Sequence, residues 1–547
     1  MIPINLAILR SSSMEMGTLY FEEIFKIKGY DLTIDFGGYN QYYQEVLNPE
    51  SFVYKKEYDA IVIFFDFDLD DSTKFLNSIN LLRKNTGSPI IIANKIVPVN
   101  TLLGIFDCNS FESEKLLIQE KNEELSKFIN PLPNTYVFDL NSVAAQVGHR
   151  GFFDKRMKYV ARSLFTPQGY AAIAKELLKF IVVLKGKTRK CIVLDCDNTL
   201  WGGIIGEDGI NGIELGEDYP GRCFVDFQKA LLDFSKKGFI LAINSKNNIN
   251  DVMEVLRNHP HQILKGNDIT VIEANWNNKV DNMRSIAKSL NIGIDSLVFI
   301  DDSPLEINLM RAKLPEVLSI DISNIFPEDL PDILYSINEL EILSYTKEDK
   351  EKIQQYRDQV KREDEKKEYS SIEDYLKSLN MKMIIYKDCQ EQLERLTQLT
   401  QKTNQFNLTT KRYTESDMTY FLTDKDINVY SFQLEDKFGN NGITGLCIVR
   451  KSGNSAIIDT FLMSCRVVER TAEFDFMKQI FTDLKKEGIF NILGVFSKTT
   501  KNELVKDLYD RIGFSLENED DVNKIYKLDL ADYKDESKSL IEVVWNQ

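Results

Sequence analysis

The sequence predicts an α/β protein made of several domains. Three observations lead to this prediction: the chain has 547 residues, 43% of them are hydrophobic, and apolar runs rich in β-branched residues alternate with helix-like segments. A chain of this length is expected to form roughly three or four domains. Buried parallel strands appear as continuous apolar runs, and strands that alternate with helices build parallel sheets.

The first region, residues 1–183, follows this alternation. INLAIL, YDAIVIFF and PIIIAN are expected to form strands. A helix pattern runs from Phe21 to Lys28, and another ends near Thr86. These elements predict an α/β domain with a parallel sheet.

The second region, residues 184–340, starts at the lysine-rich KGKTRK and repeats the pattern. Its expected strands are CIVL, FILAINS, ITVIEA and SLVFIDD. It is predicted to be a separate α/β domain with its own parallel sheet.

A charged segment and a mixed region complete the chain. Charged residues dominate from Lys347 to Tyr375 at helical spacing, which predicts a solvated helical linker over residues 341–371. Residues 372–547 combine strands such as AIIDTFLM and FNILGVF with amphipathic helices. This last region is expected to be an α+β domain.

Composition excludes several classes of protein. The net charge of -17 comes without a basic stripe, which argues against nucleic acid as a partner. No apolar segment approaches the ~20 residues of a membrane span, and MIPINLAILRSSS does not resemble a signal peptide. The seven cysteines form no CxxC pair, so neither a zinc site nor a disulfide framework is expected. We therefore expect a soluble cytoplasmic protein with reduced thiols and no membrane partner.

The stretch CIVLDCDNTLWGGIIGEDG, residues 191–209, places carboxylates at a strand's carboxyl end. Side chains alternate along a strand, so Asp195 and Asp197 point one way and Cys196 the other. Two like charges at one place need a cation or a shared proton, and ligands of open α/β sheets bind at this end of the strands. The stretch predicts a metal-assisted active site.

The other apolar runs of this region also end in polar residues. One run ends in the segment 244–247, Asn-Ser-Lys-Asn, and the last in Asp301-Asp302, while Lys279 opens a helix between them. In this order the motifs resemble those of the haloacid dehalogenase (HAD) superfamily. The resemblance implies phosphoryl transfer with Mg²⁺ as cofactor and a small phosphorylated substrate.

Each residue then has an expected role. Asp195 is the nucleophile and Asp197 handles the proton, while Mg²⁺ is held by Asp195, the backbone carbonyl of Asp197, and Asp301. Substrate phosphoryl oxygens are bound by Ser245, Lys246, Asn247 and Lys279, and Lys279 also screens the carboxylates. Asp302 and Glu306 are expected to be second-shell or helix-start acids. Few residues separate the motifs, so only the glycine-rich segment after Asp197 could cover the site, as a flap.

A closer resemblance covers nearly the whole chain. LDCDNTLWGGIIGEDG, NWNNK, FIDDSPLE, LTQKTNQFNLTTKRYT, DKFGNNGITG and FLMSCRVVER resemble the FkbH-like proteins, of the HAD-IIIC phosphatase type. The resemblance implies an enzyme that dephosphorylates a 1,3-bisphosphoglycerate-like activated acid and transfers the glyceryl group, as a thioester, to an acyl carrier protein. Alternatives are a phosphatase of surface-polysaccharide biosynthesis and a noncatalytic carrier-binding scaffold.

A thioester route needs a cysteine. Cys465 ends a strand and is followed by Arg466 and Arg470, whose charge would favour a thiolate. Cys196 is turned away from Asp195, and carboxylates would raise its pKa. Cys465 is therefore the predicted acyl acceptor, with a buried structural cysteine as the alternative.

The flanking regions resemble two further families. The last region resembles an N-acetyltransferase (GNAT) fold, but Glu469 and Thr471 stand where its pyrophosphate loop has glycines. Residues 399–414 are rich in amides and hydroxyls, which suits a polyanionic or carrier partner or else a solvated loop and helix. The first region resembles an SGNH hydrolase, with ILRSSS and Asn94 in place but its closing DxxH missing. That domain is predicted to be noncatalytic.

Overall fold

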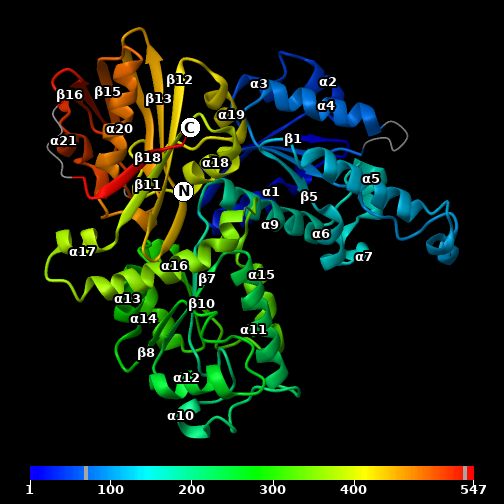
Figure 1. The fold of residues 1–547 in the computed structure, drawn as a ribbon. Coiled ribbons are helices and arrows are strands. Elements are labelled where there is room, and N and C mark those ends of the chain that lie inside the picture. The colour runs from blue at the N-terminus through cyan, green and yellow to red at the C-terminus, as the bar shows by residue number, and fades with distance from the viewer. Residues whose placement is uncertain (67–71, 346, 500, 534–538, 547) are drawn as a thin grey trace. The chain divides into compact units, whose positions relative to one another are not determined.

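The protein is described by a computed structural model that covers residues 1–66, 72–345, 347–499, 501–533 and 539–546. The chain divides into two compact units (Figure 1). Unit 1 holds Met1–Gly186 with Thr414–Asp417, and unit 2 holds Lys187–Tyr413 with Met418–Gln547. Two parallel sheets and one mixed sheet confirm the predicted multidomain α/β fold.

Unit 1 is built on a five-stranded parallel sheet of order β2-β1-β3-β4-β5. Along β1, Leu6 and Ile8 pack into one core and Ala7 and Leu9 into another, because side chains alternate across a sheet that is covered on both faces. The strands are β1 (Ile2–Arg10), β2 (Tyr30–Phe36), β3 (Ala60–Phe64), β4 (Ile90–Ala93) and β5 (Thr135–Phe138). The helices are α1 (Thr18–Ile27), α2 (Tyr42–Leu47), α3 (Phe52–Lys55), α4 (Ser72–Asn85), α5 (Glu114–Ile129), α6 (Leu140–Val147), α7 (His149–Phe152), α8 (Lys155–Ala161) and α9 (Pro167–Leu184).

Unit 2 begins with a second parallel sheet, of order β10-β9-β6-β7-β8. In β6, Ile192 and Leu194 face one core and Cys191 and Val193 the other, so the apolar run CIVL is a central strand. The strands are β6 (Cys191–Leu194), β7 (Ile240–Ser245), β8 (Val271–Ala274), β9 (Leu297–Asp301) and β10 (Leu318–Asp321). The helices are α10 (Ile205–Asp208), α11 (Gly221–Lys236), α12 (Ile249–Asn258), α13 (Lys279–Ser289), α14 (Pro304–Lys313) and α15 (Leu330–Ser336).

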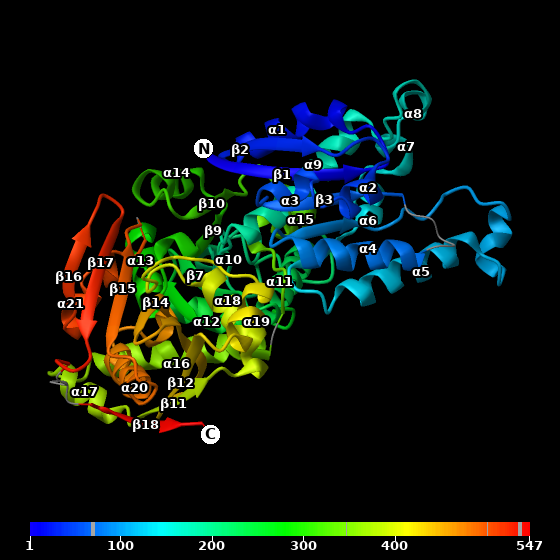
Figure 2. The ribbon, with the colours of Figure 1, turned by 90° about the horizontal axis from the view of Figure 1, so that it is seen from above.

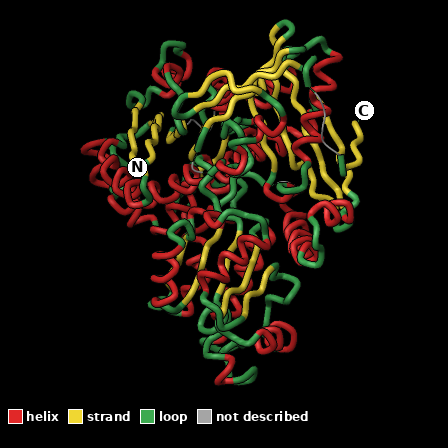
Figure 3. The backbone as a smooth tube through the Cα atoms, turned by 90° about the vertical axis from the view of Figure 1, so that its left-hand side faces the viewer, coloured by secondary structure: helices red, strands yellow, loops and turns green. Residues whose placement is uncertain are grey.

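The rest of unit 2 forms a mixed eight-stranded sheet of order β16-β17-β15-β14-β13-β12-β11-β18. Figure 3 shows its long strands in yellow, with helices in red beside them. The strands are β11 (Met381–Lys387), β12 (Ile427–Asp436), β13 (Gly439–Ser452), β14 (Ser455–Met463), β15 (Asn491–Ser497), β16 (Ser515–Glu519), β17 (Asn523–Asp529) and β18 (Ile541–Trp545). The helices are α16 (Lys347–Lys366), α17 (Ile372–Ser378), α18 (Leu393–Lys402), α19 (Glu415–Thr423), α20 (Ala472–Lys486) and α21 (Leu508–Ile512).

The charged segment is a helix, but it is not the solvated linker that the sequence predicted. In α16, Tyr356 joins the core of the second sheet, and Arg362 is almost fully buried. Arg362 binds both carboxylate oxygens of Asp436, at 2.7 and 2.8 Å, and Arg470 binds the same carboxylate at 2.9 Å. Paired charges can be buried where unpaired ones cannot. The prediction of a solvated helix relied on the number of charged residues and therefore missed the buried side of α16.

Residues 399–414 are not a solvated loop either. The pairing of β14 with β15 stops at Ile458, and the segment 406–408 follows between these strands. Leu408 N–H donates to the carbonyl of Phe461 in β14, and Ser497 N–H in β15 donates to the carbonyl of Leu408. Asn407 is fully buried, and its side-chain oxygen accepts from two backbone N–H groups. The Asn407 amide therefore satisfies the protein's own backbone.

Among the described residues, no helix is both long and apolar enough to cross a membrane.

Candidate active site

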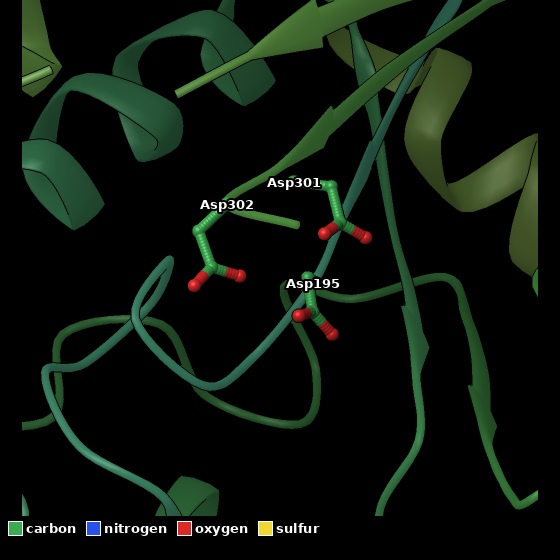
Figure 4. Close-up of side chains that lie close together, drawn as sticks. All are labelled: Asp195, Asp301 and Asp302. Carbon is green, nitrogen blue, oxygen red and sulfur yellow. The ribbon is translucent and has the colours of Figure 1, made fainter. Parts of the chain in front are cut away.

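The carboxyl ends of β6 and β9 bring three carboxylates together. Asp195 follows β6, Asp301 ends β9 and Asp302 comes next, and one oxygen of each lies within 4.8 Å of the others. Figure 4 shows the three side chains directed toward a common space. Asp301 is completely buried and Asp195 nearly so. Neighbouring parallel strands end at the same edge, which is why residues so far apart in sequence meet here.

Lys279 is the cation of this cluster. It opens α13, is buried, and places its Nζ 2.9 Å from Asp195 Oδ1 and 2.6 Å from Asp301 Oδ2. Burial by itself lowers the pKa of Lys279, but the two carboxylates outweigh burial and raise that pKa above its ordinary value. The lysine is therefore a fixed positive charge.

The cluster carries more negative than positive charge. Burial, and then the charge of Asp195, raise the pKa of Asp301 to about 7. The same two causes raise the pKa of Asp302. When all three carboxylates are ionised, the single ammonium leaves two negative charges, which a divalent cation would balance. A hard cation prefers oxygen ligands, so this donor set fits Mg²⁺.

Asp197 lies beside the cluster and not in it. Its Oδ1 accepts from Trp201 Nε1 at 2.9 Å and from the Ile205 N–H at 3.1 Å, and its Oδ2 accepts from Asn247 Nδ2 at 3.0 Å. These three donors fix the direction of the carboxylate. A role of the Asp197 backbone carbonyl at the metal stays a prediction. Asp302, which was expected to lie behind the metal ligands, contributes its own side chain to the cluster. The adjacent acid pair was the signal for Asp302 in the sequence.

The segment after β7 also borders the site. Ser245 is buried, and its Oγ accepts from Asn247 Nδ2 at 3.1 Å. Lys246 is half-exposed and binds Glu306 Oε1 at 2.6 Å. Asn247 thus links Ser245 to Asp197, while Lys246 points to a different acid on α14.

The glycine-rich segment after Asp197 forms a short hairpin. Gly202 and Glu214 exchange two backbone hydrogen bonds, of 3.1 and 2.8 Å, and α10 lies between them. At Gly202 a side chain would meet Glu214 and Phe224 at less than 3.0 Å, so this close approach needs glycine. The segment has the size expected of a flap.

Cys465 lies at the other end of the second sheet from Asp195. Its Sγ is 4.0 Å from Nζ of Lys190, the residue before β6, and its carbonyl accepts from Asn291 Nδ2. With a strand rise of about 3.3 Å per residue, the length of β6 separates Lys190 from Asp195 by roughly 16 Å. The structure therefore does not bring the predicted nucleophile and the predicted acyl acceptor together.

The two arginines that follow Cys465 are engaged elsewhere. Arg466 is buried and donates to Gln355, and Arg470 pairs with Asp436 and donates to Gln359. Cys196 is also completely buried, and burial followed by the charge of Asp195 raises its pKa. Lys190, which the sequence did not single out, is the cation next to the Cys465 sulfur.

Two residues of the loop around Arg466–Thr471 adopt backbone angles that favour glycine, although neither is glycine. Glu469 and Thr471 have φ angles of 67° and 60°, in the left-handed region that favours glycine. Thr471 therefore adopts a left-handed conformation, although a threonine at this position was expected to disfavour it. Lys366 of α16 pairs with Glu469 at 2.9 Å, so protein side chains lie against the loop.

In unit 1, two residues from the segments that resemble an SGNH hydrolase, Ser11 and Asn94, make hydrogen bonds within the domain. Ser11 Oγ accepts from the Asp66 N–H at 2.7 Å and donates to the Phe64 carbonyl at 3.4 Å. Asn94 Nδ2 donates to Asp139 Oδ1 at 2.8 Å. These contacts link the ends of β1 with β3 and of β4 with β5.

No protein-family model and no curated protein sequence matches the chain. The chain is similar to the solved N-terminal part of BF1531 from Bacteroides fragilis, which contains a phosphatase domain complexed with Mg. The identity is 28% and the TM-score 0.55, over 63% of this chain and 95% of that one. It also matches the ribosomal-protein-S18-alanine N-acetyltransferase from Escherichia coli, with 12% identity and a TM-score of 0.23, over 29% of this chain and 99% of that one. The likeness to a phosphatase domain supports the prediction that the chain is an enzyme.

Proposed function

We propose that the chain is a Mg²⁺-dependent enzyme that releases phosphate from a small phosphorylated metabolite. One observation carries the proposal: three carboxylates surround one buried lysine at the carboxyl edge of a parallel sheet. Phosphoryl transfer needs an in-line nucleophile and cations against the charge of the phosphate, and this cluster provides both. The likeness to a phosphatase domain complexed with Mg supports the same reaction class.

Asp195, Asp301 and Asp302 would hold the metal, together with the backbone carbonyl of Asp197. When bound, Mg²⁺ supplies positive charge against the oxygens of the transferring phosphoryl group. Lys279 adds a second, permanent positive charge next to Asp195. These charges act in a buried site, where they are stronger than in water.

The chain's own residues would carry the covalent steps. A carboxylate oxygen of Asp195 attacks phosphorus while the bond from phosphorus to the leaving oxygen breaks, and that oxygen takes the electron pair. Ser245 donates a hydrogen bond from its hydroxyl to a phosphoryl oxygen. Asn247, whose Nδ2 donates to Ser245 and to Asp197, holds these two side chains in place. Asp197 then accepts a proton from the water that attacks the aspartyl phosphate, which frees Asp195 and inorganic phosphate.

The substrate we propose first is an activated acid similar to 1,3-bisphosphoglycerate, on the strength of the FkbH-like motifs. A carboxylate is a good leaving group, so an acyl phosphate could react without a proton donor. Asp197 would then not have to protonate the leaving oxygen, which fits a carboxylate whose two oxygens both accept hydrogen bonds. A phosphorylated metabolite of surface-polysaccharide biosynthesis is the alternative substrate.

Transfer of the acyl group to an acyl carrier protein is a second candidate reaction of an acyl phosphate. In it a thiolate attacks the carbonyl carbon, a C–S bond forms, and the C–O bond to the phosphate breaks, so that inorganic phosphate leaves without attack by Asp195 on phosphorus; the acyl group then passes to the carrier thiol by thioester exchange. The support for this reaction is Cys465, a partly exposed thiol with the Lys190 ammonium 4.0 Å away. Because Cys465 lies at the amino end of β6 and Asp195 follows its carboxyl end, one bound substrate could not react at both residues. Mass spectrometry after incubation with 1,3-bisphosphoglycerate would show an acyl adduct on wild-type protein and none on Cys465→Ser. An adduct that survives there and disappears in Cys196→Ser would reject Cys465.

The test of the main proposal is phosphate release with Mg²⁺ and with EDTA, on a panel of small phosphorylated acids and sugar phosphates. We expect release with Mg²⁺ only, and none from Asp195→Asn. Asp233→Asn, at an exposed acid on α11 paired with Lys236, is the matched control and should behave as wild type. Release that persists in Asp195→Asn would overturn the proposal.

A further inference from the structure

An ion pair crosses the carboxyl end of β6. Lys246 follows β7, and its Nζ lies 2.6 Å from Oε1 of Glu306. Glu306 lies in the first turn of α14, the helix that follows β9 and lies beside it and β10 (Figure 2). In the sheet β6 lies between β7 and β9, and Asp195 follows β6. The pair therefore spans the strand end that carries the proposed nucleophile.

Glu306 stands where a helix-capping acid is expected, but it does not cap the helix. Residues 303–306 read SPLE, the pattern of a capping box, in which the acid accepts from the backbone N–H of the serine. In the structure the Ser303 N–H donates to Asp301 Oδ1 at 2.8 Å, and the Ser303 side chain makes no capping hydrogen bond. The carboxylate of Glu306 pairs with Lys246 instead. Helix capping therefore does not explain this buried acid.

The pair keeps both a free acceptor and free donors. Glu306 is 6% exposed, and its Oε2 is buried without a hydrogen-bond partner among the described residues. A buried acceptor that stays unpaired costs free energy, so a bound molecule that supplies a donor is stabilised here. The Lys246 side chain is 43% exposed, and its ammonium has three N–H donors, of which Glu306 takes one. A charged donor and a charged acceptor thus lie side by side at the site.

Resting on the phosphatase reaction proposed above, we infer that Lys246 and Glu306 recognise the part of the substrate that does not react. Lys246 binds a second anionic group, a carboxylate or another phosphate, and Oε2 of Glu306 accepts a hydrogen bond from a neighbouring hydroxyl. Ser245 and Lys246 are adjacent in the chain, so one small molecule can contact both. The substrate class is then a phosphorylated hydroxy acid or a hydroxylated bisphosphate. A neutral sugar phosphate has hydroxyls for Glu306 but no second anion for Lys246.

Binding to a variant without the nucleophile tests this class directly. Calorimetric titrations would use the Asp195→Asn protein with Mg²⁺. Either 3-phosphoglycerate or glycerol 1,3-bisphosphate should bind at least about tenfold more tightly than glycerol 3-phosphate, which lacks a second anion. The tighter of the two identifies that anion as carboxylate or phosphate. 3-Phosphoglycerate should also bind at least about tenfold more tightly than 3-phosphooxypropanoate, which lacks the hydroxyl.

Two added substitutions assign these preferences to the pair. Lys246→Met should remove the preference over glycerol 3-phosphate, and Glu306→Met should remove the preference over 3-phosphooxypropanoate. Lys229→Met is the matched control, because Lys229 is 45% exposed and pairs with Asp226 of α11 at 2.8 Å, and it should keep both preferences. Equal dissociation constants for all four ligands, or preferences that survive both substitutions, would overturn the inference.

Kinetics separates recognition from a purely structural role. In the otherwise wild-type enzyme, Lys246→Met should lower kcat/KM for the tighter-binding ligand at least about tenfold more than kcat/KM for para-nitrophenyl phosphate. A structural defect would lower both values equally and would count against the inference. If the wild-type enzyme released phosphate from no substrate, the phosphatase reaction would be rejected, and the titrations would still decide whether Lys246 and Glu306 recognise this class of molecule.

Discussion

The two ends of β6 have different chemistry. At the carboxyl end, Asp195 meets two other carboxylates and a buried lysine. At the amino end, Lys190 contacts Cys465, and Asp295 pairs with Lys501 of the mixed-sheet region. The first end concentrates uncompensated charge, whereas the second joins two parts of unit 2 through paired groups. A charged cluster therefore indicates catalysis only where its charges do not already balance.

The largest effect is expected from removing Asp195, the proposed nucleophile at the carboxyl end. Asp195→Asn should lower phosphate release by on the order of a thousandfold or more, since loss of a nucleophile removes the covalent route. Because the substitution also relieves repulsion, thermal unfolding of the metal-free variant should occur at or above the wild-type temperature. Normal turnover in this variant would contradict the proposal that catalysis takes place at the carboxyl end of β6.

Removing the cation should affect stability as well as turnover. Lys279→Met leaves three carboxylates without their ammonium, and breaking a buried pair typically costs about 3–5 kcal/mol. Urea unfolding of the metal-free variant should show a loss of this order, and saturating Mg²⁺ should restore part of it. Lys236→Met, at an exposed lysine of α11, is the control and should change the free energy of unfolding by less than about 0.5 kcal/mol. An equal loss in both variants would contradict the buried-charge argument.

The carboxyl end should also make stability depend on pH. The pKa of Asp301 is raised to about 7, so between its ordinary value and 7 the folded state binds a proton that the unfolded state releases. Stability of the metal-free protein should therefore fall as pH rises through this window. Mg²⁺ requires ionised carboxylates, so its stabilising effect should grow over the same range. Calorimetry should show a larger Mg²⁺-induced rise in melting temperature at pH 8 than at pH 5.5. Asp301→Asn should reduce this difference, and Asp302, whose pKa is also raised, should account for what remains.

The smallest effect is expected at the amino end. Cys465→Ser should leave hydrolysis of a generic phosphate ester within about twofold of wild type, because Lys190 and Cys465 lie roughly 16 Å of strand away from Asp195. Steady-state kinetics with para-nitrophenyl phosphate measures this. A loss of tenfold or more would mean that the two ends are coupled.

Strand-end rules predicted much of the site from the sequence. Asp195, Ser245 and Asp301 each follow or end an apolar run, so their common sheet edge was expected before any coordinates. The position of Asp302 within the cluster was not expected. The direction of the second acid of such a pair depends on the local path of the loop, which the sequence pattern does not give.

Packing between distant segments accounts for what the sequence did not reveal. Nothing in the composition of α16 distinguishes Arg362, which is buried against Asp436, from the exposed charges around it. Likewise, Asn407 is polar in sequence and completely buried in the structure. In both cases a specific partner far along the chain decides burial, and a single sequence does not name that partner.

The buried face of α16 has a practical consequence for dissecting the chain. A fragment that ended at residue 340 would remove Tyr356 from the core beneath the second sheet. A fragment that began after α16 would leave Arg466 and Arg470 without Gln355, Gln359 and their neighbour Arg362. Either cut exposes groups that water must then solvate. A fragment that keeps these buried partners together with the second sheet therefore starts at Lys187 and runs to the end of the chain, and it includes the four unit 1 residues Thr414–Asp417.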